Sequence, residues 1–142
     1  MNATIPYLNF DGNCRPAMEF YAKALGAELT IMPFSDMPGG GGGNKEATKD
    51  RIMHARLMKK GLPYAILMAS DTMPGMPYQQ GTNFSVSVGC DSLDEIKSFF
   101  SAMSEGAAVT MPLQDQFWGA HFGMLKDQFG IHWMFSYEYP KA

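Results

Sequence analysis

The chain contains two similar stretches, and this repetition constrains its fold more than any other feature of the sequence. FYAKALGAELTIMP covers residues 20–33, and FFSAMSEGAAVTMP covers residues 99–112. Each has two adjacent aromatic residues, a helical segment, a Gly-Ala step, a short apolar run with threonine and a Met-Pro pair. Two such stretches in a chain of 142 residues indicate two similarly built modules.

Each stretch lies within the same predicted order of elements. The runs TIPYLNFDG and TNFSVSVGCD precede them and are typical of strands. Apolar residues at helical spacing follow, namely Met18, Tyr21, Ala22 and Leu25 in the first half and Ile96, Phe99, Phe100 and Met103 in the second. Asn13 is expected to cap the first helix, the Ser92 to Glu95 segment is a capping box for the second, and Gly26 and Gly106 are expected to end them.

Three further strands are predicted after each helix. Their sequences are AELTIMPFS, IMHARLMKKG and YAILMASD in the first half, and AAVTMPLQ, HFGMLKDQFG and HWMFSYE in the second. The sequence therefore predicts an α+β fold in which a βαβββ module occurs twice, over about residues 3–72 and 82–139 of a single domain, 1–142. One helix covers only one face of a four-stranded sheet. Two modules related by a pseudo-twofold axis would set their open faces around a curved cleft suited to a small ligand.

Composition and charge exclude several classes of partner. The chain is 46% hydrophobic and 18% charged, and no apolar run approaches the ~20 residues of a membrane-spanning helix. The first ten residues lack the basic start and apolar stretch of a secretory signal, so we expect a cytoplasmic protein. A net charge of -3 without a basic cluster argues against nucleic acid and anionic membranes. Cys14 and Cys90 are too few for a disulfide framework or a structural zinc site.

Three segments resemble the PhnB-like branch of the vicinal oxygen chelate superfamily, which contains glyoxalase I, extradiol dioxygenases, and bleomycin and fosfomycin resistance proteins. They are PYLNFDGNCRPAMEFYAKALGAEL (6–29), IMHARLMKKG with ILMASD (52–71), and FWGAHFGMLKDQFGIHWM (117–134). The resemblance implies paired βαβββ modules and a homodimer. In this superfamily a divalent metal is usually held by one His or Glu from the first and last strands of each module, and it polarises a substrate oxygen.

The positions that match those metal ligands carry poor ligands in this chain. They are Ile5, Pro6 or Tyr7, then Leu67 or a neighbour, then Asn83 or Ser85, and finally Met134. None of these suits a hard divalent ion. His132 could be a metal ligand only if the position assigned to the last strand were wrong, because His132 lies two residues before Met134 on the same face. We therefore expect no metal and no other cofactor, with a divalent metal as the alternative.

Tyr7, Asn9 and Trp118 are candidate ligand-binding residues. Tyr7 and Asn9 alternate with Leu8 and Phe10, so the apolar pair should face the helix and the polar pair the cleft or solvent. Trp118 lies in a loop that closes the cleft in the resemblance, where an indole could stack on a flat ligand or only anchor the loop.

Three histidines complete the set of candidates. His54 and His121 occupy similar places in the two halves, so both could line the cleft, or each could bond only to a neighbouring strand or loop. His54 or His132 could act as a general base if a partner oriented the imidazole.

The remaining features have simpler interpretations. The run Gly39 to Gly43, within a glycine-rich surface loop at about residues 35–50, does not fit the phosphate-loop pattern, and a mobile loop is expected. Asp71 is expected to cap a turn. Cys14 and Cys90 lie near helix starts, which would stabilise a thiolate, although small filling residues are more common there. Methionines on the predicted strands indicate an adaptable apolar interior.

Three hypotheses for the function follow. The first is a metal-free cleft that binds a small, partly apolar molecule, as the resistance proteins do. The second is a superfamily enzyme of the glyoxalase or dioxygenase type, a lyase, isomerase or oxygenase that depends on a metal or on a His base. The third is a protein whose cleft is filled by its own side chains.

Overall fold

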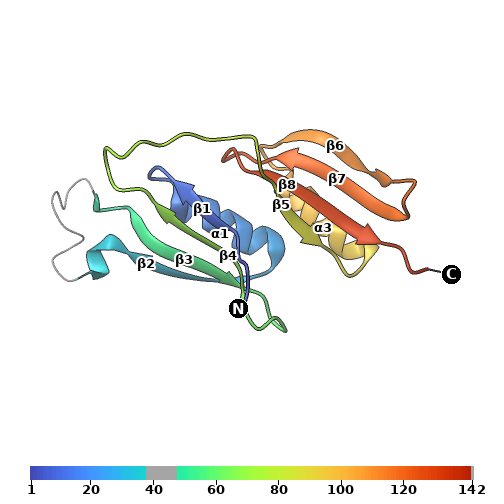
Figure 1. The fold of residues 1–142 in the computed structure, drawn as a ribbon, viewed down its shortest axis with the longest axis horizontal. Coiled ribbons are helices and arrows are strands. Elements are labelled where there is room, and N and C mark those ends of the chain that lie inside the picture. The colour runs from blue at the N-terminus through green and yellow to red at the C-terminus, as the bar shows by residue number, and fades with distance from the viewer. Residues whose placement is uncertain (38–47, 142) are drawn as a thin grey trace. The chain divides into compact units, whose positions relative to one another are not determined.

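The computed structural model describes residues 1–37 and 48–141, which form two units, Met1–Gln79 and Gln80–Ala142. Among the described residues, a long helix accompanies a four-stranded sheet in each unit (Figure 1). The Gly39 to Gly43 run lies outside the described residues, so the predicted mobile loop stays a prediction. Within the described ranges, no helix is long and apolar enough to cross a membrane.

The first unit is a βαβββ module. Its elements are β1 (Tyr7–Phe10), α1 (Cys14–Leu25), β2 (Glu28–Pro33), the short 3-10 helix η1 (Phe34–Asp36), β3 (Ile52–Met58) and β4 (Ala65–Asp71). The sheet has the order β1-β4-β3-β2, in which β1 runs parallel to β4 and the other pairs are antiparallel. Leu8, Phe10, Leu57 and Leu67 are fully buried with Met18 and Tyr21 of α1. The alternation predicted for β1 is therefore confirmed.

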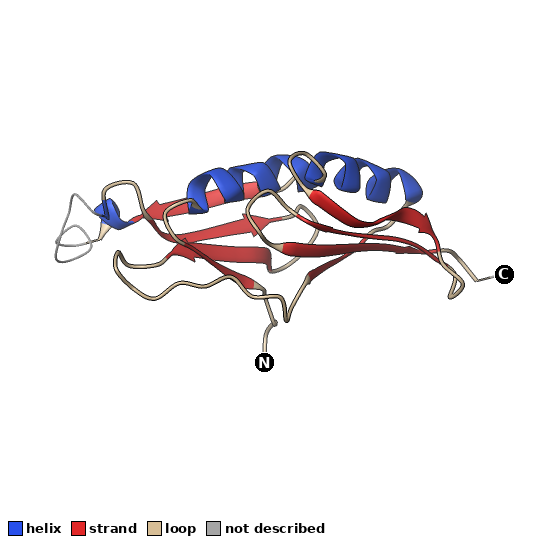
Figure 2. Cartoon of the chain, turned by 90° about the horizontal axis from the view of Figure 1, so that it is seen from above, coloured by secondary structure: helices blue, strands red, loops and turns tan. Residues whose placement is uncertain are grey.

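The second unit repeats this arrangement. Its elements are β5 (Val86–Gly89), α3 (Leu93–Met103), β6 (Ala108–Asp115), β7 (Ala120–Lys126) and β8 (His132–Glu138). The sheet has the order β5-β8-β7-β6, with β5 parallel to β8. In both units the helix covers one face of its own sheet and leaves the opposite face without a helix (Figure 2). The α+β fold of two βαβββ modules is confirmed, whereas the pseudo-twofold axis and the cleft stay predictions.

The helix ends follow the sequence signals in part. Gly26 ends α1 with φ of 61°, a left-handed conformation that favours glycine. Ser92 caps α3 by accepting a hydrogen bond from the Glu95 backbone N–H at 3.0 Å, as the capping box predicts. The Asn13 side chain makes no capping bond, so that prediction is wrong. The helix α3 ends at Met103, and Gly106 lies in the turn that follows.

The repeated Met-Pro pair has a common structural cause. Pro33 and Pro112 lie in β2 and β6, the edge strands of the two sheets, where a residue without a backbone N–H is tolerated. The strand pairing shifts register beside both prolines. The preceding Met32 and Met111 pair with His54 and Met124 of the neighbouring strands.

Candidate functional site

The face of each sheet that lies opposite its helix carries the candidate binding residues. In the first unit this polar face includes Tyr7, Asn9, Thr30, Met32, His54, Arg56, Met68 and Ser70, which alternate with buried or half-buried residues of their strands. In the second unit the methionine face consists of Ser87, Met111, Phe122, Met124, Met134 and Ser136. The helix side of the second sheet is identified by Gly123, because a Cβ atom at that position would meet the Phe100 ring of α3 at 2.8 Å.

Tyr7 and His54 contact each other on the polar face. The Tyr7 hydroxyl lies 3.2 Å from Nδ1 of His54, and the two ring centres are 5.8 Å apart. The residues come from β1 and β3, on either side of β4, and Tyr7 remains 43% exposed. The partner that a functional histidine needs is therefore present for His54, and it is a phenol rather than a carboxylate.

Asn9 lies beside this pair, at the position of β1 that pairs with Ser70 of β4. Arg56 of β3 pairs with Met68 on one side and Thr30 on the other, so it lies in the middle of the polar face. The interpretation of the sequence did not include Arg56. The signal that could have found it is strand alternation, because Arg56 is two residues from His54 and must share its face.

Three methionines form a row across the methionine face. Met134 of β8 pairs with Met124 of β7, which pairs with Met111 of β6, and Ser87 of β5 lies at the other end of the row. All three methionines are partly exposed, whereas Leu125 and Trp133 on the helix side are buried. Unbranched thioether side chains adapt their shape to an apolar partner, which makes such a row a suitable floor for varied apolar groups.

Trp118 adds an aromatic wall to the methionine face. It lies in the turn between β6 and β7, and its ring packs edge-on against Phe122 with the ring centres 5.7 Å apart. Its other neighbour, Phe117, is 98% exposed, and Trp118 itself is 53% exposed. Trp118 is therefore held in place by Phe122 while much of its surface stays available to a ligand.

His132 begins β8 and pairs with Lys126. It lies two residues before Met134, as the sequence predicts for the same face of a strand. Its Nε2 atom is buried and has no hydrogen-bond partner within the described part of the chain. A buried ring nitrogen without a partner is open to a ligand or an ordered water.

His121 does not lie on an open face, so the expectation that it matches His54 is wrong. The pairing of β7 with β8 places His121 with Gly123 and Leu125 on the helix side, and the residue that matches His54 is Phe122. His121 instead bonds through Nδ1 to Asp115 at 2.9 Å. Tyr139 donates its hydroxyl to the same carboxyl oxygen at 2.6 Å, and this bond and that of His121 lower the pKa of Asp115.

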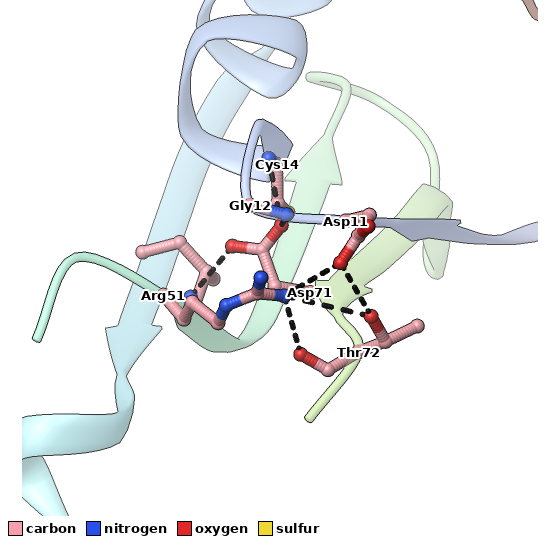
Figure 3. Close-up of polar contacts among 7 residues, drawn as sticks. Asp11, Gly12, Cys14, Arg51, Asp71 and Thr72 are labelled. Atoms are coloured by element: carbon pink, nitrogen blue, oxygen red, sulfur yellow. Dashed lines mark hydrogen bonds and ion pairs between the residues drawn. The ribbon is translucent and has the colours of Figure 1, made fainter. Parts of the chain in front are cut away.

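Asp71 has a structural role, as expected, but it accepts three backbone N–H groups from two separate parts of the chain rather than capping one turn. One carboxyl oxygen accepts the backbone N–H groups of Gly12 at 2.8 Å and Cys14 at 3.0 Å, and the other accepts that of Ile52 at 2.8 Å (Figure 3). Beside it, Arg51 donates to Asp11 at 3.1 Å and to the Thr72 carbonyl at 2.8 Å. These bonds join the ends of three strands and the start of α1.

The two cysteines are poorly placed for thiolate chemistry. Burial, with a smaller contribution from Asp71, raises the pKa of Cys14 to about 12. Burial, with Glu95 and Asp91, raises the pKa of Cys90 to about 11. Both side chains are free thiols, and the thiolate expected near a helix start is disfavoured because desolvation outweighs the helix terminus.

The residues at the metal positions of the resemblance do not fit a hard divalent ion. Leu67 faces α1 and is buried, so the open-face residue of β4 that pairs with Tyr7 is Met68. Asn83 and Ser85 precede β5, and the open-face residue that pairs with Met134 is Ser87. A phenol, two thioethers and a hydroxyl replace the hydration shell of such an ion poorly. Within residues 1–37 and 48–141, no three His, Cys, Asp or Glu residues are grouped so as to hold a metal.

Comparisons with known proteins agree with the fold. The sequence model of a family described as 3-demethylubiquinone-9 3-methyltransferase matches residues 2–136. The chain is 31% identical to protein YjdN of Escherichia coli K12 over 92% of each chain. The crystal structure of protein PA1353 from Pseudomonas aeruginosa is 43% identical, with a TM-score of 0.83 over 95% of this chain and 96% of that one.

Two solved structures bear on the resemblance found in the sequence. A Bacillus cereus PhnB protein, titled a putative 3-demethylubiquinone-9 3-methyltransferase, is 23% identical, with a TM-score of 0.72 over 94% of this chain and 98% of that one. A glyoxylase/bleomycin resistance protein/dioxygenase domain from Frankia is 13% identical, with a TM-score of 0.66 over 100% of this chain and 95% of that one. At these identities the similarity shows the fold alone, and it is the fold that the resemblance implies.

Proposed function

Because the chain belongs to the PhnB-like family described as 3-demethylubiquinone-9 3-methyltransferase, and its fold is that of glyoxalase and bleomycin resistance proteins, we propose that it binds a small, partly apolar molecule. The proposed binding surface is a sheet face that the helix of its own unit leaves open, and no metal takes part. The description of the family names a methyl transfer, and no feature of the described residues favours that reaction over binding.

The observation that carries this proposal is the exposed aromatic and thioether surface around Trp118. Phe122 fixes the indole at the edge of the methionine face, where Met111, Met124 and Met134 supply an adaptable floor. Clustered apolar side chains on the surface of a small protein mark interaction sites more often than isolated ones do. A flat apolar ligand would gain contact with the indole and the thioethers together.

Fluorescence quenching tests the proposal, because the two tryptophans differ in exposure. Trp118 is 53% exposed, whereas Trp133 is 1% exposed and donates its indole N–H to Asp127 at 2.8 Å. A bound ligand should protect Trp118 from acrylamide and leave Trp133 unchanged. Replacing Trp118 by Ala should weaken binding by about 1–3 kcal/mol without unfolding the protein. A ligand that binds the variant as tightly as the parent would show that Trp118 only anchors its turn.

A second candidate function is an enzyme of the superfamily that uses a histidine base. The observation that favours it is the Tyr7 to His54 contact, because a phenol can orient an imidazole or pass a proton to it. Any ligand found in the quenching screen should then be followed by NMR for turnover. If His54 is the base, His54→Gln should abolish turnover of that ligand without unfolding the protein.

Two further parts of the proposal rest on the resemblance and on composition. We propose a homodimer, which large exposed apolar side chains such as Phe84 and Phe117 support, and light scattering of the purified chain would measure its mass. We also propose a cytoplasmic location, because both cysteines are free thiols. Fractionation of cells that produce the chain would test the location.

A further inference from the structure

Arg56 lies in the middle of the polar face and has no partner among the described residues. It makes no hydrogen bond or ion pair with any other residue of the described ranges. The nearest carboxylate in the strand pairing is that of Glu28, two residues before Thr30 on β2. Glu28 pairs with Met58 and forms no ion pair with Arg56. By contrast, Arg51 in the same unit is bonded to Asp11 and Thr72. Arg56 is thus a cation that the described part of its module leaves available.

Hydrogen-bond donors surround this cation. Tyr7 and His54 lie on the same face, and so do Asn9, Thr30 and Ser70, whose side chains make no hydrogen bond within the described residues. Neighbouring strands are about 4.8 Å apart, so one small acid group can reach a long Arg side chain and a donor from the next strand together. Guanidinium groups bind carboxylate and phosphate oxygens through two parallel bonds.

Apolar side chains also lie beside Arg56. Met68 pairs with Arg56 directly, and Met32 pairs with His54 on the next row. Such thioethers suit the hydrocarbon part of a ligand whose acid group Arg56 holds.

The second module provides an internal comparison for Arg56. Arg56 pairs with Met68 of β4, and Met68 pairs with Tyr7 of β1. In the second unit, Met124 pairs with Met134 of β8, which pairs with Ser87 of β5. Arg56 and Met124 therefore occupy equivalent positions in the sheets of the two modules. The fold does not require a cation there, and a methionine is compatible with this position in the strand.

We propose that Arg56 binds the acid group of a small organic anion, a carboxylate or a phosphate, on the polar face, with the hydroxyl and amide donors around it completing the site. This inference rests on the proposed small-molecule function and names the chemical class of the ligand. It is independent of Trp118, because every residue of the anion site belongs to the first unit.

Three aromatic probes of similar size separate charge from shape. Benzoate and phenyl phosphate carry the two candidate acid groups, and benzamide is neutral. Calorimetry on the full chain should give dissociation constants for the anions at least about tenfold lower than for benzamide, since an ionic hydrogen bond accounts for that ratio or more. The more tightly bound of benzoate and phenyl phosphate identifies the acid group that the site prefers.

Arg56→Met, which copies the second module, should remove this preference, so that the anions bind no better than benzamide. Arg15→Met is the matched control, because Arg15 lies on α1 with its side chain 50% exposed and its loss changes the net charge equally. The control should keep the preference. An equal loss in both variants, equal binding of benzamide and benzoate by the parent, or no binding of either anion at about 10 mM would overturn the proposal.

The outcome for Trp118 keeps the two proposals distinct. If Arg56→Met loses the anion preference while an apolar ligand still protects Trp118 from acrylamide, both proposals hold. If neither anion binds the parent but Trp118 is protected by a neutral ligand, the anion site is wrong and the proposed function stands. If anions bind through Arg56 and no ligand protects Trp118, the anion site stands and the apolar surface is not the binding surface.

Discussion

The carboxylate of Asp71 accepts the backbone N–H of Ile52 at 2.8 Å, which ties the end of β4 to the start of β3. The same carboxylate accepts the N–H groups of Gly12 and Cys14 before and within α1. Removing it leaves three backbone donors without their acceptor, two of them at buried bonds. Unpaired buried donors are among the few causes of large losses of stability.

Asp71→Ala should therefore lower the free energy of unfolding by about 2–4 kcal/mol. Asp11→Ala is the control in the same cluster. The half-exposed Asp11 carboxylate pairs with Arg51 and accepts the Thr72 hydroxyl at 3.2 Å, and exposed contacts of this kind should cost less than about 1 kcal/mol. Urea denaturation of the two variants beside the parent measures both changes. Equal losses would show that Asp71 is not the residue that joins these elements.

Much of this fold could be predicted from the sequence, because its determinants are local. Leu8 and Phe10 alternate with Tyr7 and Asn9, and the alternation alone assigns them to opposite faces of β1. The capping box at Ser92 was equally visible. Strand order, in contrast, pairs Tyr7 of β1 with Met68 of β4, 61 residues later, and no local pattern specifies that partner.

The errors in the predicted site arose where a residue's surroundings depend on parts of the chain distant in sequence or on the exact strand register. The match of His54 with His121 was wrong by one position, and a shift of one residue moves a side chain to the other face of a strand. The cap of α1 comes from Asp71, which is distant in sequence, rather than from the adjacent Asn13. Arg56 was missed because its surroundings depend on pairing with both neighbouring strands.

Gly123 is the position at which a side chain should be least tolerated in the second sheet. A Cβ atom there would lie 2.8 Å from Cε2 of Phe100, 2.9 Å from Cδ2 of Leu113 and 3.1 Å from the Met111 carbonyl oxygen. Gly123→Ala should cost about 1–3 kcal/mol of stability through overpacking. Gly89→Ala is the matched strand variant, because nothing lies within 4 Å of its Cβ position, and it should be neutral or slightly stabilising. A neutral Gly123→Ala in thermal unfolding would contradict this packing.

The two thiols should react slowly in the folded protein. With pKa values raised to about 12 for Cys14 and about 11 for Cys90, their thiolate fractions at pH 8 are at least about a hundredfold below those of the unfolded chain. A disulfide reagent such as DTNB should label both rapidly in guanidinium chloride and neither rapidly in buffer, with Cys90 first. Because burial raises both folded pKa values, keeping the thiols neutral in the core contributes to the free energy of unfolding. This contribution is complete below about pH 8.5, the ordinary thiol pKa, and is lost as the pH rises toward the folded values of about 11 and 12. Rapid labelling of Cys14 in buffer would contradict its burial.

Asp115 should titrate below its ordinary range because of Tyr139 and then His121, whose bonds lower its pKa. The Tyr139 bond to Asp115 correspondingly raises the pKa of the phenol. A lowered carboxyl pKa adds stability above about pH 4 that is lost as the pH falls through the folded pKa. Tyr139→Phe should move the Asp115 carboxyl titration, followed by carbon NMR, toward its ordinary value. Tyr137→Phe is the control, since Tyr137 contacts the Tyr139 ring without bonding to Asp115. An unmoved titration in Tyr139→Phe would exclude this bond in solution.

Added divalent metals should leave the melting temperature unchanged, because Tyr7, Met68, Ser87 and Met134 offer no hard-ion ligands at the matching positions. A metal present at about 100 times its dissociation constant would stabilise the folded chain by about 2.7 kcal/mol and raise the melting temperature by several degrees. Zinc, nickel, manganese or ferrous iron at micromolar levels should therefore shift it by no more than about one degree from a chelator-treated control. The purification tag must be removed first, because its histidines bind these ions independently of the fold. A reproducible shift of several degrees, with one metal per chain or per dimer retained after dialysis, would make a metal-dependent superfamily enzyme the leading function.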